Sequence, residues 1–346
     1  MLAKKMIRAA FAASAALALS VAVQPAQAED AAAFYKGKTI TFITPGSPGG
    51  GYDTYMREII PHLEKKTGAT VVPVNEPGGG HLLAVNKTYS AKADGLTILL
   101  NDGEASLLGV VLDVPGARYD LSKMNWIGRI NAEKRLILFT KSSPYKNLKD
   151  AIAGKTVLKF GTTGKTDATG LATTMASHAL GLPTSIVTGY KGSREFVRAA
   201  IQGEVGAISL SESSALRFSK GGRLIPAGTL ARERSALFPK TPTVFEQLKI
   251  SKENAWFLDF HEGFAEIGRS LLTGPGVPAD RVAYLRKVFK EILTDKDFDA
   301  HMTKKKRPIT YADATALDKA AKAVLGDLSD ARKKQVKEII LNKFYQ

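Results

Sequence analysis

The stretch ITFITPGSPGGGYDTYMREII, residues 40–60, decides how the chain folds. Residues 40–44 have the apolar, β-branched character of a strand, residues 45–51 form a glycine-rich loop, and the rest has the apolar spacing of a helix. Glycines allow the backbone to approach a ligand closely, and the start of a helix carries unpaired N–H donors at the positive end of its dipole. The stretch therefore predicts a cradle for a small anion, although an ordinary strand-to-helix turn has a similar pattern.

Two more strand–loop–helix units follow this stretch. The predicted strand 70–75 continues into Glu76-Pro-Gly-Gly-Gly80, and the predicted strand 96–100 continues into the loop 101–106. Three such units in succession indicate a parallel sheet with right-handed crossovers. Ligands of such sheets bind beyond the carboxyl ends of the strands, where all three loops are expected to lie.

A second series repeats this pattern after an extended segment at 126–140. Its predicted strands are separated by helices and lie at 156–160, 185–188, 205–210 and 224–228. The chain is expected to leave the first unit near residue 131 and to return near residue 265. The sequence therefore predicts two α/β lobes joined by two crossover segments, with a ligand cleft between them. The expected divisions are lobe 1 at 29–131, lobe 2 at 132–264, and a return to lobe 1 with C-terminal helices at 265–346.

The first 28 residues have the features of a secretory signal peptide. Lys4, Lys5 and Arg8 precede an apolar, alanine-rich run, and Ala26-Gln27-Ala28 matches a cleavage site. Cleavage near Ala28 would leave a mature chain of 318 of the 346 residues, exported to the periplasm. Since no later stretch is apolar over a membrane-crossing length, we expect a soluble mature protein that is not itself embedded in the membrane.

Composition narrows the classes of function. The chain has no cysteine, so packing rather than disulfides must stabilise it, and its formal charge is +16. A basic surface favours anionic partners, but the exported compartment disfavours nucleic acid. The basic residues are dispersed except at Lys304-Lys-Lys-Arg307. The five histidines have no metal-ligand spacing, so we expect neither a metal nor a cofactor.

Several motifs together resemble one family of receptors. The chain is similar to the extracytoplasmic solute receptors of tripartite tricarboxylate transporters, the Bug or TctC-like periplasmic binding proteins. The matching stretches begin at Pro45 with its Gly-Gly and Asp53, and continue through Val74 to Gly80, Ala93 to Thr97, Val187 to Ser193, Ala200 to Val205, Gly222 to Pro226, Pro239 to Val244 and Gly274 to Pro278. This resemblance implies a type II-like periplasmic binding protein fold, no enzymatic activity, and delivery of a small carboxylate to the membrane subunits of a transporter. We expect a monomer.

The resemblance also implies where the solute binds. Receptors of this kind hold a carboxylate between the lobes through the first strand-to-helix loop and a facing loop of lobe 2, which correspond here to 45–53 and 162–169. Both loops are rich in glycine or threonine and enter helices, so two helix dipoles would converge on one anion. The candidate ligand-binding residues are Pro45, Gly46, Ser47, Gly49, Gly50, Tyr52, Asp53, Thr162, Thr163, Lys165, Thr166, Thr169, Ser209 and Ser211.

Some candidates have structural alternatives. Asp53 suits a helix cap as well as a ligand contact, the threonines suit turns and caps, and Lys165 suits a solvated rim. Pro48 and a longer segment at 256–269 depart from the family pattern. That segment places Asp259, His261, Glu262 and Glu266 near the expected cleft entrance.

Rival functions find less support. Gly161-Thr-Thr-Gly164-Lys-Thr166 resembles a phosphate-binding loop, but the glycine that this motif requires five residues before Gly164 is Lys159. The loop does not match a dinucleotide-binding fingerprint, because the second glycine that this motif requires after Gly46 is replaced by Pro48. A hydrolase acting on an anionic substrate, and a binding module that docks onto a sensor instead of a permease, stay open as alternatives.

Overall fold

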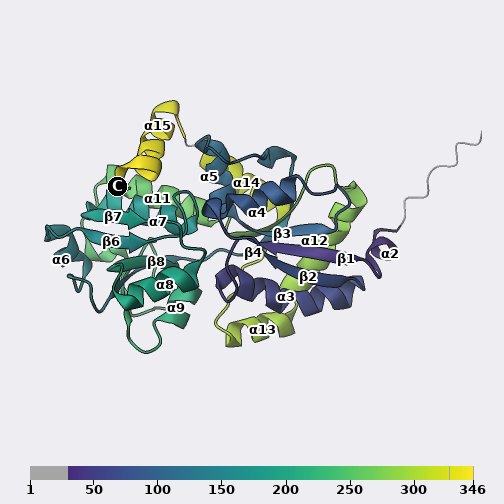
Figure 1. Ribbon diagram of the computed structural model, residues 1–346, viewed down its shortest axis with the longest axis horizontal. Coiled ribbons are helices and arrows are strands. Elements are labelled where there is room, and N and C mark those ends of the chain that lie inside the picture. Colours follow the sequence, from purple (N-terminus) through teal and green to yellow (C-terminus); the bar gives the residue numbers. More distant parts are fainter. Residues whose placement is uncertain (1–29, 327, 346) are drawn as a thin grey trace, which may run out of the picture.

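The computed structural model describes residues 30–326 and 328–345, so the predicted signal peptide lies outside the described residues. Two α/β lobes lie side by side, each built on its own sheet (Figure 1). The predicted fold class is confirmed. None of the helices in the described ranges combines the length and the apolar character needed to cross a bilayer.

Lobe 1 is built on a six-stranded sheet. Its order is β11-β4-β10-β3-β1-β2, with β1 at Thr39–Thr44, β2 at Thr70–Asn75, β3 at Thr97–Asp102, β4 at Asn125–Asn131, β10 at Arg269–Thr273 and β11 at Ala312–Asp313. The pairs β1–β2 and β1–β3 are parallel, as predicted, but β10 is antiparallel to β3 and β4. The reason is the path of the chain: β10 begins beside Asp102, at the carboxyl end of β3, and therefore runs in the opposite direction.

Lobe 2 is built on a five-stranded sheet. Its order is β7-β6-β8-β5-β9, with β5 at Arg135–Thr140, β6 at Leu158–Gly161, β7 at Thr184–Val187, β8 at Ala207–Ser211 and β9 at Leu224–Thr229. The single extended segment predicted at 126–140 is two strands, because β4 ends in one sheet and β5 begins in the other. Residues 132–134 therefore form one connection between the lobes, and residues 266–268, after α11, form another.

Helices cover both sheets. Their bounds are α2 Ala31–Tyr35, α3 Gly51–Thr67, α4 Leu82–Tyr89, α5 Gly103–Val111, α6 Leu148–Ala153, α7 Ala168–Leu180, α8 Ser193–Gln202, α9 Glu212–Phe218, α10 Val244–Gln247, α11 Lys252–Ala265, α12 Ala279–Leu293, α13 Lys296–Lys304, α14 Ala314–Gly326 and α15 Asp330–Glu338. Short 3₁₀ turns lie at Gly79–His81 and Leu121–Lys123, and a π-helical turn lies at Ile339–Lys343.

The helix α3 shows how the decisive stretch folds. Its apolar residues Tyr55, Met56, Ile59 and Leu63 recur at helical spacing and are fully buried against the sheet and α12. The helix ends at Gly68, whose φ of 67° is a left-handed conformation that glycine adopts without a steric penalty. Burial of this face fixes the N-terminus of α3 at the edge of lobe 1 that faces lobe 2.

The two lobes share an apolar core on one side. Side chains of α5, α7 and α11 form one continuous buried cluster. The C-terminal segment contributes Val336, Ile339 and Ile340 to it, and the π-helical turn packs against α7. The chain therefore crosses between the lobes again after α14, and α15 lies over lobe 2 (Figure 1). The predicted range 265–346, a return to lobe 1 with C-terminal helices, does not indicate on which lobe these last helices pack.

Candidate functional site

A small cavity lies between the lobes, with a volume of about 50 Å³. Lobe 1 contributes the loop before α3, the first turn of that helix, and three side chains from elsewhere: His81, Asp102 and Arg269. Lobe 2 contributes Arg135, residues at the start of α7 and α8, and the end of β8. Both walls are thus made of helix N-termini and strand ends.

Backbone contacts close the lobes around this cavity. Gly164 of lobe 2 lies so near Gly80 of lobe 1 that a Cβ atom on Gly164 would be 2.5 Å from the Cα atom of Gly80. A Cβ atom on Gly192 would lie 2.3 Å from Ser47 Oγ. Glycine is required at both positions for this approach. The structure is therefore that of the closed form.

The N-terminus of α3 is open to the cavity. No side chain caps this helix, and Gly50, Gly51 and Tyr52 line the cavity directly. Asp53 lies behind them: its carboxylate accepts a hydrogen bond from Gly49 N at 2.8 Å and pairs with Arg57 Nε at 2.9 Å. Asp53 therefore holds the loop in shape, while the amides of the first turn of α3 stay available for an anion.

The N-terminus of α7 is already filled by carboxylates. Asp167 accepts hydrogen bonds from Thr169 N and Gly170 N, and Asp102 of lobe 1 reaches across to accept one from Ala168 N at 3.2 Å. Asp102 also binds His81 Nδ1 at 2.7 Å. Burial raises the pKa of Asp102, but the hydrogen bond and charge of His81 outweigh burial and lower it overall. Asp102 thus stays ionised and bridges the lobes.

Two buried arginines line the cavity, one from each lobe. Arg269 begins β10 in lobe 1, and Arg135 begins β5 in lobe 2; their exposed fractions are 6% and 7%. Arg269 pairs with Glu133 and lies 5.0 Å from the ring centres of Tyr52 and Tyr55. The Nε atoms of both arginines are buried and have no hydrogen-bond partner among the described residues. An unpaired buried donor is costly, so each guanidinium retains hydrogen-bonding capacity that the described residues do not satisfy.

The partner of Arg135 is a weakly held carboxylate. Arg135 Nη2 lies 3.5 Å from Glu104 Oε1, which is long for a charged hydrogen bond. Burial raises the pKa of Glu104 to about 7, and Arg135 only partly opposes this. His261 Nε2 is 3.9 Å from the other oxygen of Glu104, and burial lowers the pKa of His261 to about 3. The carboxyl group of Glu104 therefore titrates near neutral pH, 3.5 Å from Arg135.

Comparison with known proteins places this arrangement in a family. The sequence model for the tripartite tricarboxylate transporter family receptor matches residues 55–316. The chain belongs to that family. It is 27% identical to the protein BugT of Bordetella pertussis over 61% of this chain and 66% of that relative.

Solved structures agree with the fold of the receptor. The periplasmic binding protein BugD has a TM-score of 0.71 and 19% identity, covering 90% of this chain and all of that one. A protein of R. palustris solved with adipate has a TM-score of 0.70 and 19% identity, covering 88% of this chain and 97% of that one. The family is one of receptors and not of enzymes, which agrees with the expectation of a non-enzymatic binding protein.

Half of the residues proposed from the sequence line the cavity of the receptor: Gly46, Ser47, Gly50, Tyr52, Thr163, Thr169 and Ser211. The other half do not line it: Pro45, Gly49, Asp53, Thr162, Lys165, Thr166 and Ser209. Lys165 differs most from the prediction, because its Nζ donates to Leu341 O at 2.6 Å and lies 4.3 Å from the ring centre of Tyr345. The C-terminal segment thus engages the only lysine of the facing loop 162–169.

The segment 256–269 also differs from the expectation. Most of it belongs to α11, where Asp259 forms an exposed ion pair with Arg232. His261 is buried, while Glu262 and Glu266 border a neighbouring hollow of about 180 Å³ that includes Arg135. Three of the four ionisable groups expected near the cleft entrance, His261, Glu262 and Glu266, therefore line the same hollow as Arg135.

Among the residues of the cavity that sequence reasoning missed are its histidine, its aspartate and its two arginines: His81, Asp102, Arg135 and Arg269. One signal was present for the arginines. Each stands at the start of an otherwise apolar strand, in RLILFT and RSLLT. A charged residue opening a buried strand is uncommon unless it has a partner or a ligand. The described residues contain no group of three or more histidines and carboxylates that could hold a metal ion.

Proposed function

We propose that this receptor captures a small carboxylate-bearing solute between its lobes in the periplasm and delivers it to a tripartite tricarboxylate-type membrane transporter. One observation carries the proposal: two buried arginines, Arg135 and Arg269, line the closed cavity, one from each lobe, and the Nε donor of each has no partner among the described residues. They lie in the same cavity as the uncapped N-terminus of α3.

A carboxylate fits this set of donors. Guanidinium groups bind carboxylates through planar, charge-assisted hydrogen bonds, and helix N-termini supply further N–H donors. A solute that contacts both arginines interacts with both lobes only when they are closed. Such differential contact stabilises the closed form over the open one.

The dimensions of the cavity favour a small solute. A buried water needs roughly 10–15 Å³ of such volume, so the observed 50 Å³ corresponds to roughly three to five waters. The R. palustris relative holds adipate, a six-carbon diacid. We therefore infer that acids no longer than adipate are the best candidates.

The experiment is a thermal-shift screen of the mature chain, residues 29–346, refolded from denaturant to remove co-purified solute. The panel contains mono-, di- and tricarboxylates, amino acids and aromatic acids, each beside its methyl ester. We expect one class of acid to raise Tm, by about 2.7 kcal/mol of stabilisation at a hundredfold excess over Kd, while its ester does not. Equal shifts with acid and ester, or a folded protein that responds to no acid, would contradict carboxylate capture.

A further inference from the structure

The basic motif Lys304-Lys-Lys-Arg307 has no part in the cavity, but it folds in a defined way. Helix α13 ends at Lys304, and the chain turns back through Lys306, whose φ of 57° is left-handed. Arg307 N donates to Met302 O at 2.8 Å and thereby closes this turn. The turn sends Arg307 inward, where only 3% of the residue is exposed, and leaves Lys305 and Lys306 at the surface.

This motif forms one wall of a second hollow between the lobes, which we call the basic groove. Lobe 1 contributes Lys305, Lys306 and Arg307. Lobe 2 contributes Arg217 of α9 and Lys220 of the turn that follows this helix. The groove has a volume of about 320 Å³. Arg217 Nη1 also donates to Gly49 O of lobe 1 at 2.9 Å, so the two walls are held together in the closed form.

Positive charge is in excess in the basic groove. Its one carboxylate, Glu58, already pairs with Lys305 Nζ and with His301 Nε2. The next acidic group near Arg307 is Glu133, which pairs with Arg269 of the cleft cavity. Arg217, Lys220, Lys306 and Arg307 therefore face the groove with no carboxylate of their own in it.

Arg307 gives the second observation. In the part of the chain that the structure describes, the side chain of this buried arginine makes one hydrogen bond, from Nη1 to Ser213 Oγ at 2.7 Å. A guanidinium has five N–H donors, so most of them lack a protein acceptor. Burial also lowers the pKa of Arg307, and the charges of Arg269 and Arg217 act in the same direction against Glu133. A bound anion would satisfy these donors and relieve the repulsion.

We propose that the basic groove is a second anion site, separate from the cleft cavity, that takes a small oxyanion such as a carboxylate or phosphate. Because its walls come from both lobes, an anion there stabilises the closed form. Stabilising the closed form increases the affinity of the cleft for its solute. Only this increase in affinity depends on the proposed function; binding of the anion in the groove does not. The oxyanion is either a free ion or a distal group of the solute itself.

The test uses inorganic phosphate as the probe, without any cleft solute. The mature protein is titrated by calorimetry and by thermal shift, with sodium chloride added to hold the ionic strength constant. We expect saturable binding and a rise in Tm. The double variant Lys220→Gln with Lys306→Asn should bind about tenfold more weakly, because it removes two exposed positive charges from the groove. Asparagine is chosen at position 306 because it tolerates a left-handed backbone.

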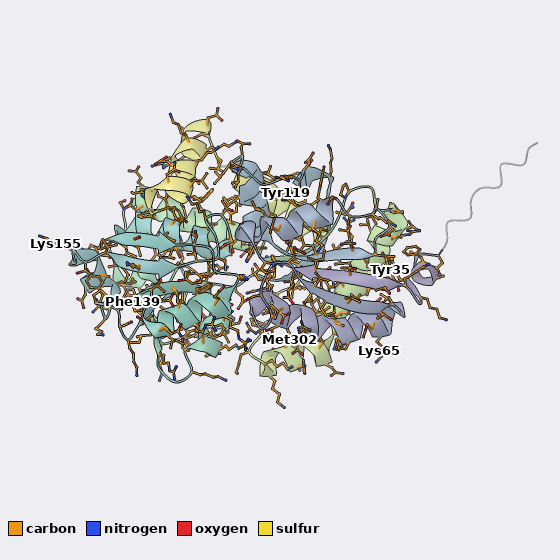
Figure 2. All side chains as sticks on the ribbon, in the orientation of Figure 1. Tyr35, Lys65, Tyr119, Phe139, Lys155 and Met302 are labelled. Carbon is orange, nitrogen blue, oxygen red and sulfur yellow. The ribbon has the colours of Figure 1, made fainter. Side chains whose placement is uncertain are left out.

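The matched control is Lys155→Gln with Lys141→Asn, which removes the same charge from exposed positions. Lys155 lies at the outer end of lobe 2, away from lobe 1 (Figure 2). The control should bind phosphate like the wild type. Equal weakening in both double variants would show a general charge effect, and linear, unsaturated heats in the wild type would show that there is no site. Either result would overturn the proposal.

A second arm separates the two sources of the anion and tests the coupling. Solute affinity is measured with and without saturating phosphate. A free-anion site predicts tighter solute binding with phosphate, whereas a site for a distal solute group predicts competition and weaker binding. No change in either direction would overturn the coupling. The phosphate titration reports on the groove even when no acid binds in the cleft, so the two proposals fail separately.

Discussion

The N-termini of α3 and α7 face each other across the cleft, and they differ in what occupies them. No side chain caps α3, and its first-turn residues line the cavity. The first amides of α7 are taken by Asp167 and, from the other lobe, by Asp102. Both helices follow loops rich in glycine or threonine, so their local sequences suggest the same role. A helix N-terminus is therefore available to a bound anion only where no carboxylate of the protein already fills it.

The largest expected effect comes from removing the carboxylate that lobe 1 places at the N-terminus of α7. Asp102→Ala leaves His81 buried without its partner and frees Ala168 N. Breaking a buried pair in this way should cost about 3–5 kcal/mol of unfolding free energy, measured by urea denaturation. Asp102→Asn, which keeps an acceptor oxygen, should lose less than the alanine variant. A loss below about 1 kcal/mol for Asp102→Ala would show that this contact does not hold the lobes together.

The next effect concerns the proton on Glu104. Its pKa in the folded protein is raised to about 7 from an ordinary 4.5, so the folded state binds more protons than the unfolded state between these pH values. Stability that depends on Glu104 is therefore present below pH 4.5 and is lost as the pH rises to 7. The wild type should lose about 1–3 kcal/mol relative to Glu104→Gln across this window. Parallel stability curves for the two proteins would contradict the raised pKa.

The open N-terminus of α3 is tested by adding one methyl group. A Cβ atom on Gly51 would lie 3.2 Å from Ser214 Oγ and 3.3 Å from Arg269 Nη2. Gly51→Ala should therefore weaken solute binding about tenfold by crowding the cavity, with little change in unfolding free energy. The control Gly326→Ala, where a Cβ atom meets nothing within 4 Å, should leave affinity intact. Undiminished affinity in Gly51→Ala would show that the solute does not lie against α3.

The smallest effect is expected at Asp53. Asp53→Ala removes the acceptor of Gly49 N and the partner of Arg57, so it should lower unfolding free energy by about 1 kcal/mol. Affinity should fall modestly with it, because the loop before α3 loses its support. Lost binding with unchanged melting would mean instead that Asp53 contacts the solute directly.

The predictable parts of this protein are those set by neighbouring residues. The strand Thr39–Thr44, the loop after it and the ending of α3 at Gly68 follow from local spacing and glycine chemistry, and the predicted strand at 70–75 agrees with β2. The resemblance to the receptor family was also confirmed, because its motifs are spread along most of the chain.

The rest depends on contacts between distant residues. Arg269 reaches the cavity because β10 pairs beside Asn131, 138 residues earlier in the chain. Asp102 fills the N-terminus of α7 across 66 residues, and Lys165 meets Leu341 across 176. The spacing of apolar residues in the C-terminal segment predicts amphipathic helices, but it does not indicate against which lobe they pack. Local patterns therefore predict where the loops lie, but they do not predict which N–H donors of these loops are already hydrogen-bonded to distant residues.

Whether Arg135 and Arg269 hold a carboxylate between the lobes is decided by one calorimetric comparison. The acid that gives the largest thermal shift is titrated into the mature wild type and into Arg135→Gln. Arg135 is the better choice because its pair with Glu104 is long, at 3.5 Å, whereas Arg269 is closely paired with Glu133. We expect one site per chain and binding about a hundredfold weaker in the variant, because the variant loses a charged hydrogen bond. Equal affinities in the two proteins would contradict this expectation.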